Sequence, residues 1–228
     1  MRISAAAARA GRDPAAIALL AVSKAHGAAA VAEAARAGQN AFGENYAREA
    51  LEKMQAVAER LGKTHAGALE WHFIGPLQSN KTRAVAERFA WVHSVERVKI
   101  ARRLSDQRPA PLAPLEVLVQ VNVSGEASKS GVSPEGVEAL AHAVARLPRL
   151  RLRGLMTVPE PSDDQSLQRA RFRSLRELLE RLRAQGLVLD TLSMGMSGDL
   201  ESAIAEGATM VRVGTAIFGE RRKEKSAA

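Results

Sequence analysis

Short runs of apolar and β-branched residues alternate with longer segments of helical periodicity along the whole chain. This alternation is typical of a parallel sheet whose strands are joined by crossover helices. The pattern predicts eight strands, over Leu19–Ser23, Ala41–Gly43, Trp71–Ile74, Trp91–Val92, Glu116–Asn122, Leu152–Met156, Thr191–Met194 and Met210–Val213. The helical periodicity predicts helices over Ala28–Ala37, Tyr46–Leu61, Lys81–Ala90, Val98–Asp106, Pro134–Arg146, Gln165–Gln185 and Leu200–Glu206.

Eight β/α units in a chain of 228 residues predict an α/β protein with a single (β/α)8 TIM barrel that is compact for its class. An open doubly wound sheet is the alternative, but no Gly-x-Gly-x-x-Gly motif follows the first strand, as a dinucleotide-binding domain would require. No linker divides the sequence, so residues 1–228 are expected to form one domain. An amphipathic helix over 1–18, capped at Asp13-Pro14, is expected to pack on the barrel, and 221–228 to form a flexible tail.

Composition and charge exclude several classes of protein. No apolar stretch approaches the roughly 20 residues of a membrane span, and the first residues lack the apolar centre of a secretory signal, so a cytoplasmic protein is expected. The net charge of +8 comes from arginines that lie beside glutamates on helices, and aromatic residues make up only 4% of the chain, so nucleic-acid binding is not expected. There is no cysteine, and the five histidines lack the spacing of a metal site.

Lys24 closes the first strongly apolar run of the chain. A lysine at the end of a buried strand brings its amine into a desolvated site. Desolvation lowers the pKa of the amine and so favours its neutral, nucleophilic form. Such a lysine is a candidate for Schiff-base chemistry. The alternative is a loop lysine that points into solvent.

Polar residues follow the predicted strands, and in a TIM barrel these positions converge on the catalytic end. The loops after the seventh and eighth strands commonly hold a phosphate in such barrels, and here they contain Ser197 and Gly214-Thr215. Arg212 lies within a strand of valines, where an unpaired guanidinium would be costly to bury, so it needs either a structural ion pair or a cofactor acceptor. A lysine for an aldehyde, donors for a phosphate and an arginine for a ring acceptor together indicate pyridoxal 5′-phosphate (PLP).

Long motifs across nearly the whole chain resemble those of the pyridoxal-phosphate homeostasis proteins. They are AVSK at Ala21–Lys24, FGENY at Phe42–Tyr46, WHFIGPLQSNK at Trp71–Lys81, VNVSGEASKSG at Val121–Gly131, RGLM at Arg153–Met156, LSMGMS at Leu192–Ser197 and VRVGTAIFGER at Val211–Arg221. The resemblance implies a PLP fold type III-like barrel, similar to the N-terminal domain of alanine racemase but without its C-terminal β domain.

The resemblance also implies roles for individual residues. Lys24 would carry the internal aldimine, and Arg212 would face the pyridine nitrogen. The remaining positions expected at the cofactor are Asn45 near the ring, Met196 in the LSMGMS motif, and Ser197, Gly214 and Thr215 at the phosphate.

The expected function is a PLP carrier in intracellular PLP and amino-acid homeostasis, without robust turnover. An arginine beside the pyridine nitrogen weakens the ring as an electron sink, and racemases of this fold add a tyrosine from a second β domain, which is not expected here. Tyr46 is the sole tyrosine. The expected protein is a monomer, with PLP-dependent apoenzymes as candidate partners. The alternatives are a single-domain PLP-dependent amino-acid racemase and a Schiff-base aldolase that acts on a sugar phosphate.

Three further residues lie outside the set expected at the cofactor. His72 lies between two aromatic residues on a strand and is expected to be a hydrogen-bonded core histidine. Lys129 and Lys81 lie in family motifs near the mouth of the barrel, where each either assists a second anionic ligand or is a solvated loop lysine.

Overall fold

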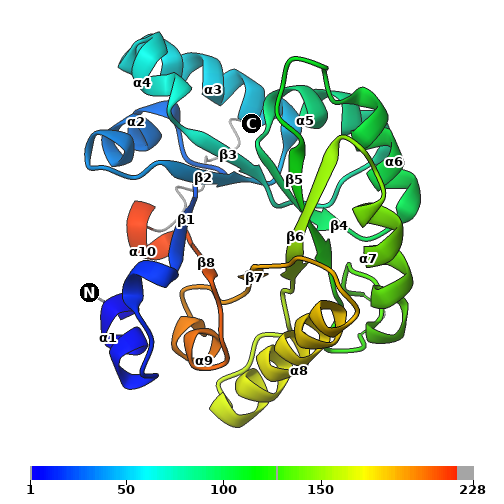
Figure 1. Ribbon diagram of the computed structural model, residues 1–228. Coiled ribbons are helices and arrows are strands. Elements are labelled where there is room, and N and C mark those ends of the chain that lie inside the picture. Colours follow the sequence, from blue (N-terminus) through cyan, green and yellow to red (C-terminus); the bar gives the residue numbers. More distant parts are fainter. Residues whose placement is uncertain (1, 127, 220–228) are drawn as a thin grey trace, which may run out of the picture.

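Eight parallel strands close into a barrel in which each strand pairs with its sequence neighbours and β8 pairs with β1 (Figure 1). The computed structural model describes residues 2–126 and 128–219. The strands are β1 (Ala18–Val22), β2 (Ala41–Glu44), β3 (Glu70–Phe73), β4 (Trp91–Val95), β5 (Leu115–Gln120), β6 (Leu150–Met156), β7 (Thr191–Ser193) and β8 (Met210–Val213). The predicted (β/α)8 barrel is therefore confirmed, and strand boundaries differ from the predicted ones by three residues at most.

Helices surround the barrel on the outside (Figure 1). The helices of the described residues are α1 (Arg2–Arg9), α2 (Ala28–Arg36), α3 (Ala47–Leu61), α4 (Lys63–Gly67), α5 (Thr82–Arg88), α6 (Val98–Gln107), α7 (Val137–Ala145), α8 (Gln165–Ala184), α9 (Leu200–Ala205) and α10 (Thr215–Phe218), with 3-10 turns at Pro14–Ala16, Ser79–Lys81 and Pro134–Gly136. The sequence did not predict α4 and α10, because four or five residues are too few to show a helical period.

The N-terminal helix is shorter than the predicted one over 1–18. Helix α1 (Arg2–Arg9) ends before Gly11, whose φ of +63° breaks the helix. Asp13 does not cap α1, because its carboxylate accepts the backbone N–H of Ala15 and caps the following 3-10 turn. Helix α1 packs against α9, where Arg2 pairs with Glu201 at 2.8 Å. The tail expected over 221–228 lies outside the described residues.

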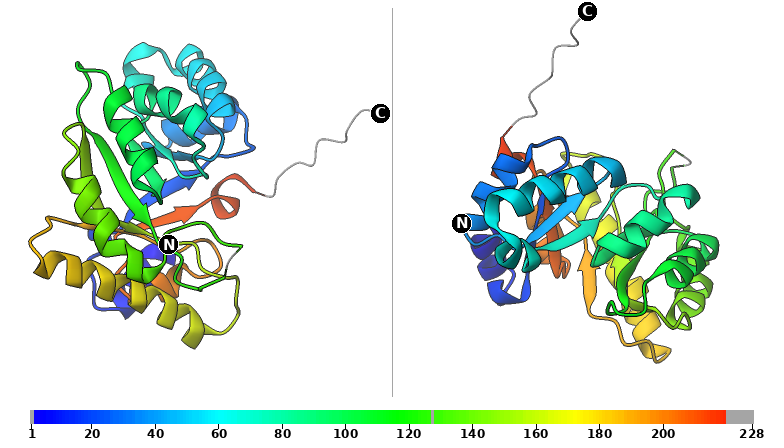
Figure 2. Two further views of the ribbon diagram at one scale, coloured as in Figure 1. Left: turned by 90° about the vertical axis from the view of Figure 1, so that its right-hand side faces the viewer. Right: turned by 90° about the horizontal axis from the view of Figure 1, so that it is seen from above.

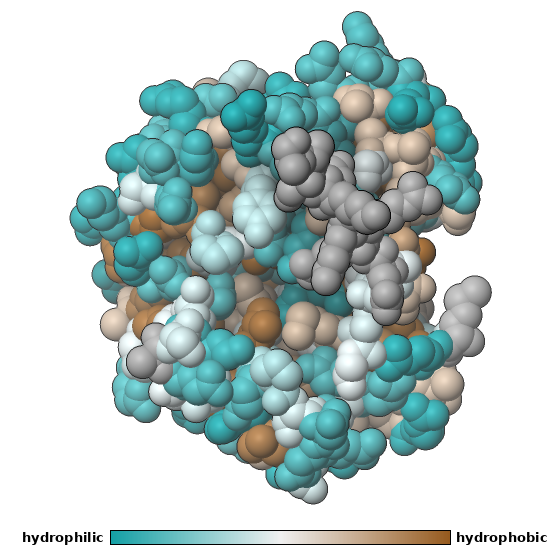
Figure 3. All heavy atoms as spheres, turned by 180° about the vertical axis from the view of Figure 1, so that it is seen from behind, coloured by the Kyte–Doolittle hydropathy of each residue, from teal (hydrophilic) through white to brown (hydrophobic). Residues whose placement is uncertain are grey.

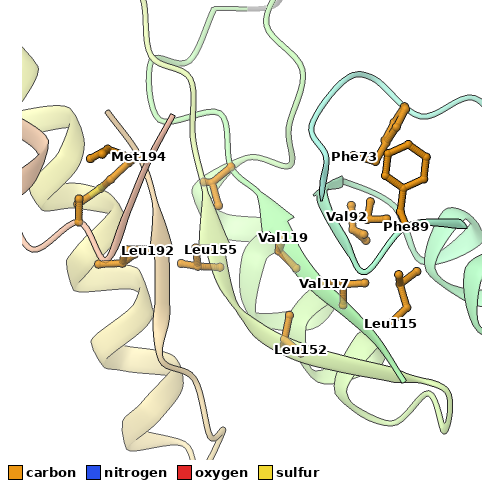
Figure 4. Packing of buried hydrophobic residues seen from close by; sticks show 14 of the residues in the cluster. Phe73, Phe89, Val92, Leu115, Val117, Val119, Leu152, Leu155, Leu192 and Met194 are labelled. Atoms are coloured by element: carbon orange, nitrogen blue, oxygen red, sulfur yellow. The ribbon is translucent and has the colours of Figure 1, made fainter. Parts of the chain in front are cut away.

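The apolar core has two parts. The larger part lies between the barrel and the helices, and Figure 4 shows side chains of β3 to β7 packed in it, such as Val117 and Leu155, together with Met194, which follows β7. The smaller part fills the inside of the barrel with Trp91, Leu118 and Met156. Along β5, Val117 and Val119 belong to the larger part and Leu118 to the smaller one. Successive residues of a strand point to opposite sides of the sheet, so every second one faces the inside of the barrel.

The loops that follow the strands gather at one end of the barrel. Figure 2 shows α10 and the loop after β5 projecting from this same end in both views. The loops after β2 and β3 are in tight contact, since a Cβ at Gly75 would lie 2.2 Å from the carbonyl oxygen of Asn45. A side chain there would displace the Asn45 backbone, so Gly75 fixes the position of Asn45.

Candidate functional site

A cavity of about 530 Å³ opens at the carboxyl end of the barrel. The structure brings all seven residues expected at the cofactor to its wall, namely Lys24, Asn45, Met196, Ser197, Arg212, Gly214 and Thr215. They come from loops or strands of four different β/α units, and the barrel topology is what brings them together. The volume of the cavity lies within the range of small-molecule sites.

The backbone around Lys24 is fixed on both sides by buried side chains. Before it, Ser23 donates its hydroxyl to Glu44 Oε1 at 2.6 Å, and its carbonyl accepts a hydrogen bond from Lys53 Nζ at 2.8 Å. After it, Ala25 has a φ of +62°, a left-handed conformation that few residues other than glycine adopt. Its N–H donates to Glu49 Oε1 at 2.9 Å. Lys24 is therefore presented to the cavity from a held loop.

Glu44 does not share the mouth of the barrel with Asn45, although the two follow the second strand together in the sequence. Its side chain is fully buried and pairs with Lys53 at 2.7 Å on the helix side of the barrel. Burial raises the pKa of the Glu44 carboxyl, and Lys53 only partly opposes this. Asn45 does line the cavity, and its buried Oδ1 has no hydrogen-bond partner among the described residues. An orphaned acceptor beside a cavity is typical of a ligand contact.

The loops after β7 and β8 present backbone donors to the cavity. The N–H groups of Ser197, Gly198, Gly214 and Thr215 donate no hydrogen bond within the part of the chain that the structure describes. Asp199 Oδ1 accepts the N–H of Met196 at 2.6 Å and so holds the first of these loops. A Cβ at Gly214 would lie 3.1 Å from the carbonyl oxygen of Val22, so this backbone lies close against β1. Grouped N–H donors of this kind bind anions such as phosphate.

Arg212 lies at the floor of the cavity and is only 4% exposed. It donates to Ser193 O at 2.6 Å, to Ser193 Oγ at 2.8 Å and to Thr157 O at 2.8 Å. Burial lowers the pKa of Arg212 to about 10, so the guanidinium stays charged at neutral pH. Its partners are neutral oxygens, and the sequence alternative of a structural ion pair is not found among the described residues.

The wall of the cavity carries cations but no carboxylate among its described residues. The cations Lys24, Lys129 and Arg212 line it together with His26, and no Asp or Glu does. A concave site lined by one sign of charge attracts the opposite sign. The outer surface seen from behind Figure 1 is mostly hydrophilic, with hydrophobic residues in small separate groups (Figure 3). Because the charged side chains of its wall are cationic, the cavity suits a small anion better than an apolar ligand.

Other polar residues that follow strands do not reach the cavity. Gln78, Ser79, Asn80, Lys81 and Asn122 lie outside its wall. His72 is fully buried and hydrogen-bonded, as predicted for a core histidine.

Sequence reasoning missed several cavity residues, namely Ile74, Gln120, Ser128, Ser130 and Val158. Gln120 could have been identified in the same way as Arg212, because it is a polar residue within a run of valines and leucines.

The described ranges, 2–126 and 128–219, contain neither a candidate metal site nor a candidate membrane span. No cluster of three or more His, Asp or Glu side chains could hold a metal ion there. None of the helices in those ranges combines the length and the apolar composition needed to cross a membrane.

Comparisons with known proteins agree with this geometry. The family described as alanine racemase, N-terminal domain, matches residues 2–222. The pyridoxal phosphate homeostasis protein of Pseudomonas aeruginosa is 62% identical over 96% of this chain and 91% of its own. PipY of Synechococcus elongatus PCC7942, solved with PLP bound, has a TM-score of 0.81 and 37% identity, over 95% of this chain and 100% of PipY.

A more distant likeness bears on the fold alone. An alanine racemase of Clostridium difficile 630 has a TM-score of 0.71 and 17% identity, over 91% of this chain and 53% of the racemase. The full-length relatives at high identity, together with the matched domain family, settle the assignment: the chain belongs to the family of pyridoxal phosphate homeostasis proteins.

Proposed function

We propose that this chain binds PLP in the cavity at the carboxyl end of the barrel, joined to Lys24, and acts as a PLP carrier without robust turnover. The observation that carries the proposal is the convergence of Lys24, the donors around Ser197 and Gly214, and Arg212 on one cavity free of carboxylates among its described residues. Each group matches a different part of the cofactor.

The residues present fit the cofactor. The four backbone N–H groups and the Ser197 hydroxyl would bind the phosphate, and the charged Arg212 would face the pyridine nitrogen. The orphaned Oδ1 of Asn45 offers an acceptor to a ring substituent. When bound, PLP supplies an aldehyde carbon that condenses with the Lys24 amine, with the loss of one water. The loop held by Glu44, Glu49 and Lys53 orients that amine.

The carrier role is supported by the position of the sole tyrosine and by the arginine proposed at the pyridine nitrogen. Racemisation needs two proton-transfer groups on opposite faces of the substrate carbon, each within about 3 Å of its proton. Tyr46, the sole tyrosine, is 61% exposed and lies outside the cavity wall. A guanidinium at the pyridine nitrogen also weakens the ring as an electron sink. The racemase alternative rests instead on His26 and Lys129, which line the cavity with Lys24.

We extend this proposal to the setting of the protein. A role in PLP homeostasis, as the name of the relatives states, fits a monomeric carrier in the cytoplasm that supplies PLP-dependent apoenzymes. Reactivation of an apoenzyme by the loaded protein, compared with an equal concentration of free PLP, tests this extension. No reactivation by the loaded protein would contradict it.

Absorbance spectroscopy tests the site. The parent protein mixed with PLP should show the visible band of a lysine-bound cofactor, and reduction with borohydride should fix the cofactor on Lys24, as peptide mass spectrometry would show. Lys24→Ala should lose the band. An aldolase with a Schiff-base lysine would show no such band as purified, before PLP is added.

Two lysines provide matched controls. Lys81→Ala should keep the band, because Lys81 lies in a family motif but outside the cavity wall. Lys129→Ala should also keep it, although Lys129 lines the cavity. A reduced adduct on Lys129 in the parent protein would show that Lys24 is not the anchor.

A further inference from the structure

A chain of hydrogen bonds crosses the inside of the barrel from the cavity to the opposite end. Arg212 Nη1 donates to Ser193 Oγ at 2.8 Å, and Ser193 Oγ lies 3.0 Å from His93 Nδ1. His93 Nε2 lies 2.9 Å from His72 Nδ1, and His72 Nε2 lies 2.8 Å from Glu70 Oε1. Glu70 opens β3, and its side chain is 49% exposed. We call these five residues the relay.

The groups at the two ends of the relay, Arg212 and Glu70, determine which atom donates and which accepts in each of its hydrogen bonds. A guanidinium only donates, so Ser193 Oγ accepts from Arg212 and has its own proton left to give. That proton goes to His93 Nδ1, which makes Nε2 the protonated nitrogen of His93. His93 then donates to His72 Nδ1, and His72 donates from Nε2 to the Glu70 carboxylate, which only accepts. Every donor thus meets an acceptor, and only one arrangement of protons achieves this.

The middle of the relay is shielded from water. His72, His93 and Ser193 are each 0% exposed. Trp91 stacks on His72, with ring centroids 5.2 Å apart and planes at 6°, and the Arg153 guanidinium lies 4.9 Å from the Trp91 ring centre. Burial lowers the pKa of His72 and, more strongly, that of His93. Both rings are therefore neutral, as the single arrangement of protons requires, with Glu70, Arg153 and Arg212 as the charges around them.

We propose that His93 and Ser193 are positioning residues for Arg212. His72 and Glu70 fix the direction of the hydrogen bonds, so that the Ser193 hydroxyl donates its proton to His93 and not toward Arg212. The proposal rests on Arg212 being the PLP contact given above. Two of the three hydrogen bonds of the Arg212 guanidinium go to Ser193. If the Ser193 hydroxyl pointed its proton at Arg212, two donors would meet and the guanidinium would shift. The relay prevents this and keeps Arg212 aimed into the cavity.

Nitrogen NMR of the histidine rings tests the direction in the unmodified protein, without PLP. With ¹⁵N-labelled imidazoles, His72 and His93 should both be neutral and protonated on Nε2, assigned by comparison with His72→Gln and His93→Gln. Neither ring should gain a second proton between about pH 7 and 8, because burial lowers the pKa of both. Protonation of either ring on Nδ1 would overturn the proposal, because Ser193 would then have no acceptor for its proton.

A matched pair of variants tests the effect on Arg212. In His93→Asn, Oδ1 occupies the place of Nδ1 and still accepts from Ser193. In His93→Gln, Nε2 occupies the place of the ring Nε2 and still donates to His72, but the acceptor for Ser193 is lost. Both variants lose the ring, so a merely structural role would affect them similarly.

PLP affinity distinguishes the two variants. His93→Gln should bind PLP about three- to tenfold more weakly than the parent protein, and His93→Asn should stay within about twofold of it. Equal losses, or no loss in His93→Gln, would reject a positioning role. Absence of PLP binding by the parent protein would instead reject the proposed function, while the NMR result on the relay would still stand.

Discussion

Lys53 Nζ lies 2.7 Å from Glu44 Oε1, and both side chains are almost fully buried beneath the loop that carries Lys24. Lys53 comes from α3 and Glu44 from β2, so the pair joins a helix to the barrel. Lys53 also donates to Ser23 O and to Glu49 Oε1. One ammonium therefore connects three segments around the proposed anchor lysine.

Replacing Lys53 by Met should lower the free energy of unfolding by about 3–5 kcal/mol, because it leaves the Glu44 carboxylate buried without its partner. Urea denaturation at pH 7 measures the change. Arg48→Met is the matched control, because Arg48 pairs with Glu52 on the same helix with both side chains mostly exposed, and it should cost under about 1 kcal/mol. Similar losses in the two variants would contradict a special role for the buried pair.

Replacing Ser197 by Ala should weaken PLP binding about ten- to a hundredfold, since a hydroxyl bond to a dianion is charge-assisted. Binding of unphosphorylated pyridoxal should hardly change. Titration of both ligands by absorbance measures the two affinities. An equal loss for both ligands would place Ser197 away from the phosphate.

The loaded protein should exchange the α-proton of L- or D-alanine in D₂O no faster than free PLP does, within about tenfold, because a positioned acid and base pair would add roughly 10²–10⁴. NMR follows the exchange. Tyr46→Phe should leave the rate unchanged, as its side chain lies outside the cavity wall. Exchange several orders of magnitude faster, abolished in Tyr46→Phe, His26→Gln or Lys129→Ala, would establish a racemase and identify its second base.

Glu206 should make the protein less stable in acid. Its side chain is 4% exposed and pairs with Arg169 at 2.8 Å and Arg173 at 3.0 Å. Burial alone would raise the pKa of the Glu206 carboxyl, but the two arginines outweigh it and lower the pKa below 4.5. A lowered pKa gives stability that is present above about pH 4.5 and is lost as the pH falls through the folded-state value.

Urea denaturation of Glu206→Gln checks this sign. The variant should be about 1–2 kcal/mol less stable than the parent protein at pH 7. The difference should shrink as the pH falls below about 4.5. A difference that stays constant down to pH 3 would mean that the carboxylate contributes nothing that depends on its charge.

Much of the fold was predictable because each β/α unit has its own hydrophobic pattern. The convergence of Lys24 and Arg212 followed from topology, since the carboxyl ends of barrel strands meet in space. The relay was not predictable, because it joins His93 to Ser193 across the barrel, and the strand pattern does not say which inward side chains touch. The burial of Glu44 on the helix side of the barrel was missed for a related reason. Its partner Lys53 lies nine residues away, on a helix whose sequence has the pattern of a solvent-exposed helix.

The cationic wall of the cavity has a consequence for selectivity. Electrostatic attraction by Lys24, Lys129 and Arg212 does not distinguish the phosphate of PLP from inorganic phosphate or from a sugar phosphate. These anions would therefore compete for the same loops, and only a ligand that also carries an aldehyde within reach of Lys24 would be retained. In a cell rich in phosphate esters, charge would bring many ligands to this site, and the reversible covalent bond would select among them.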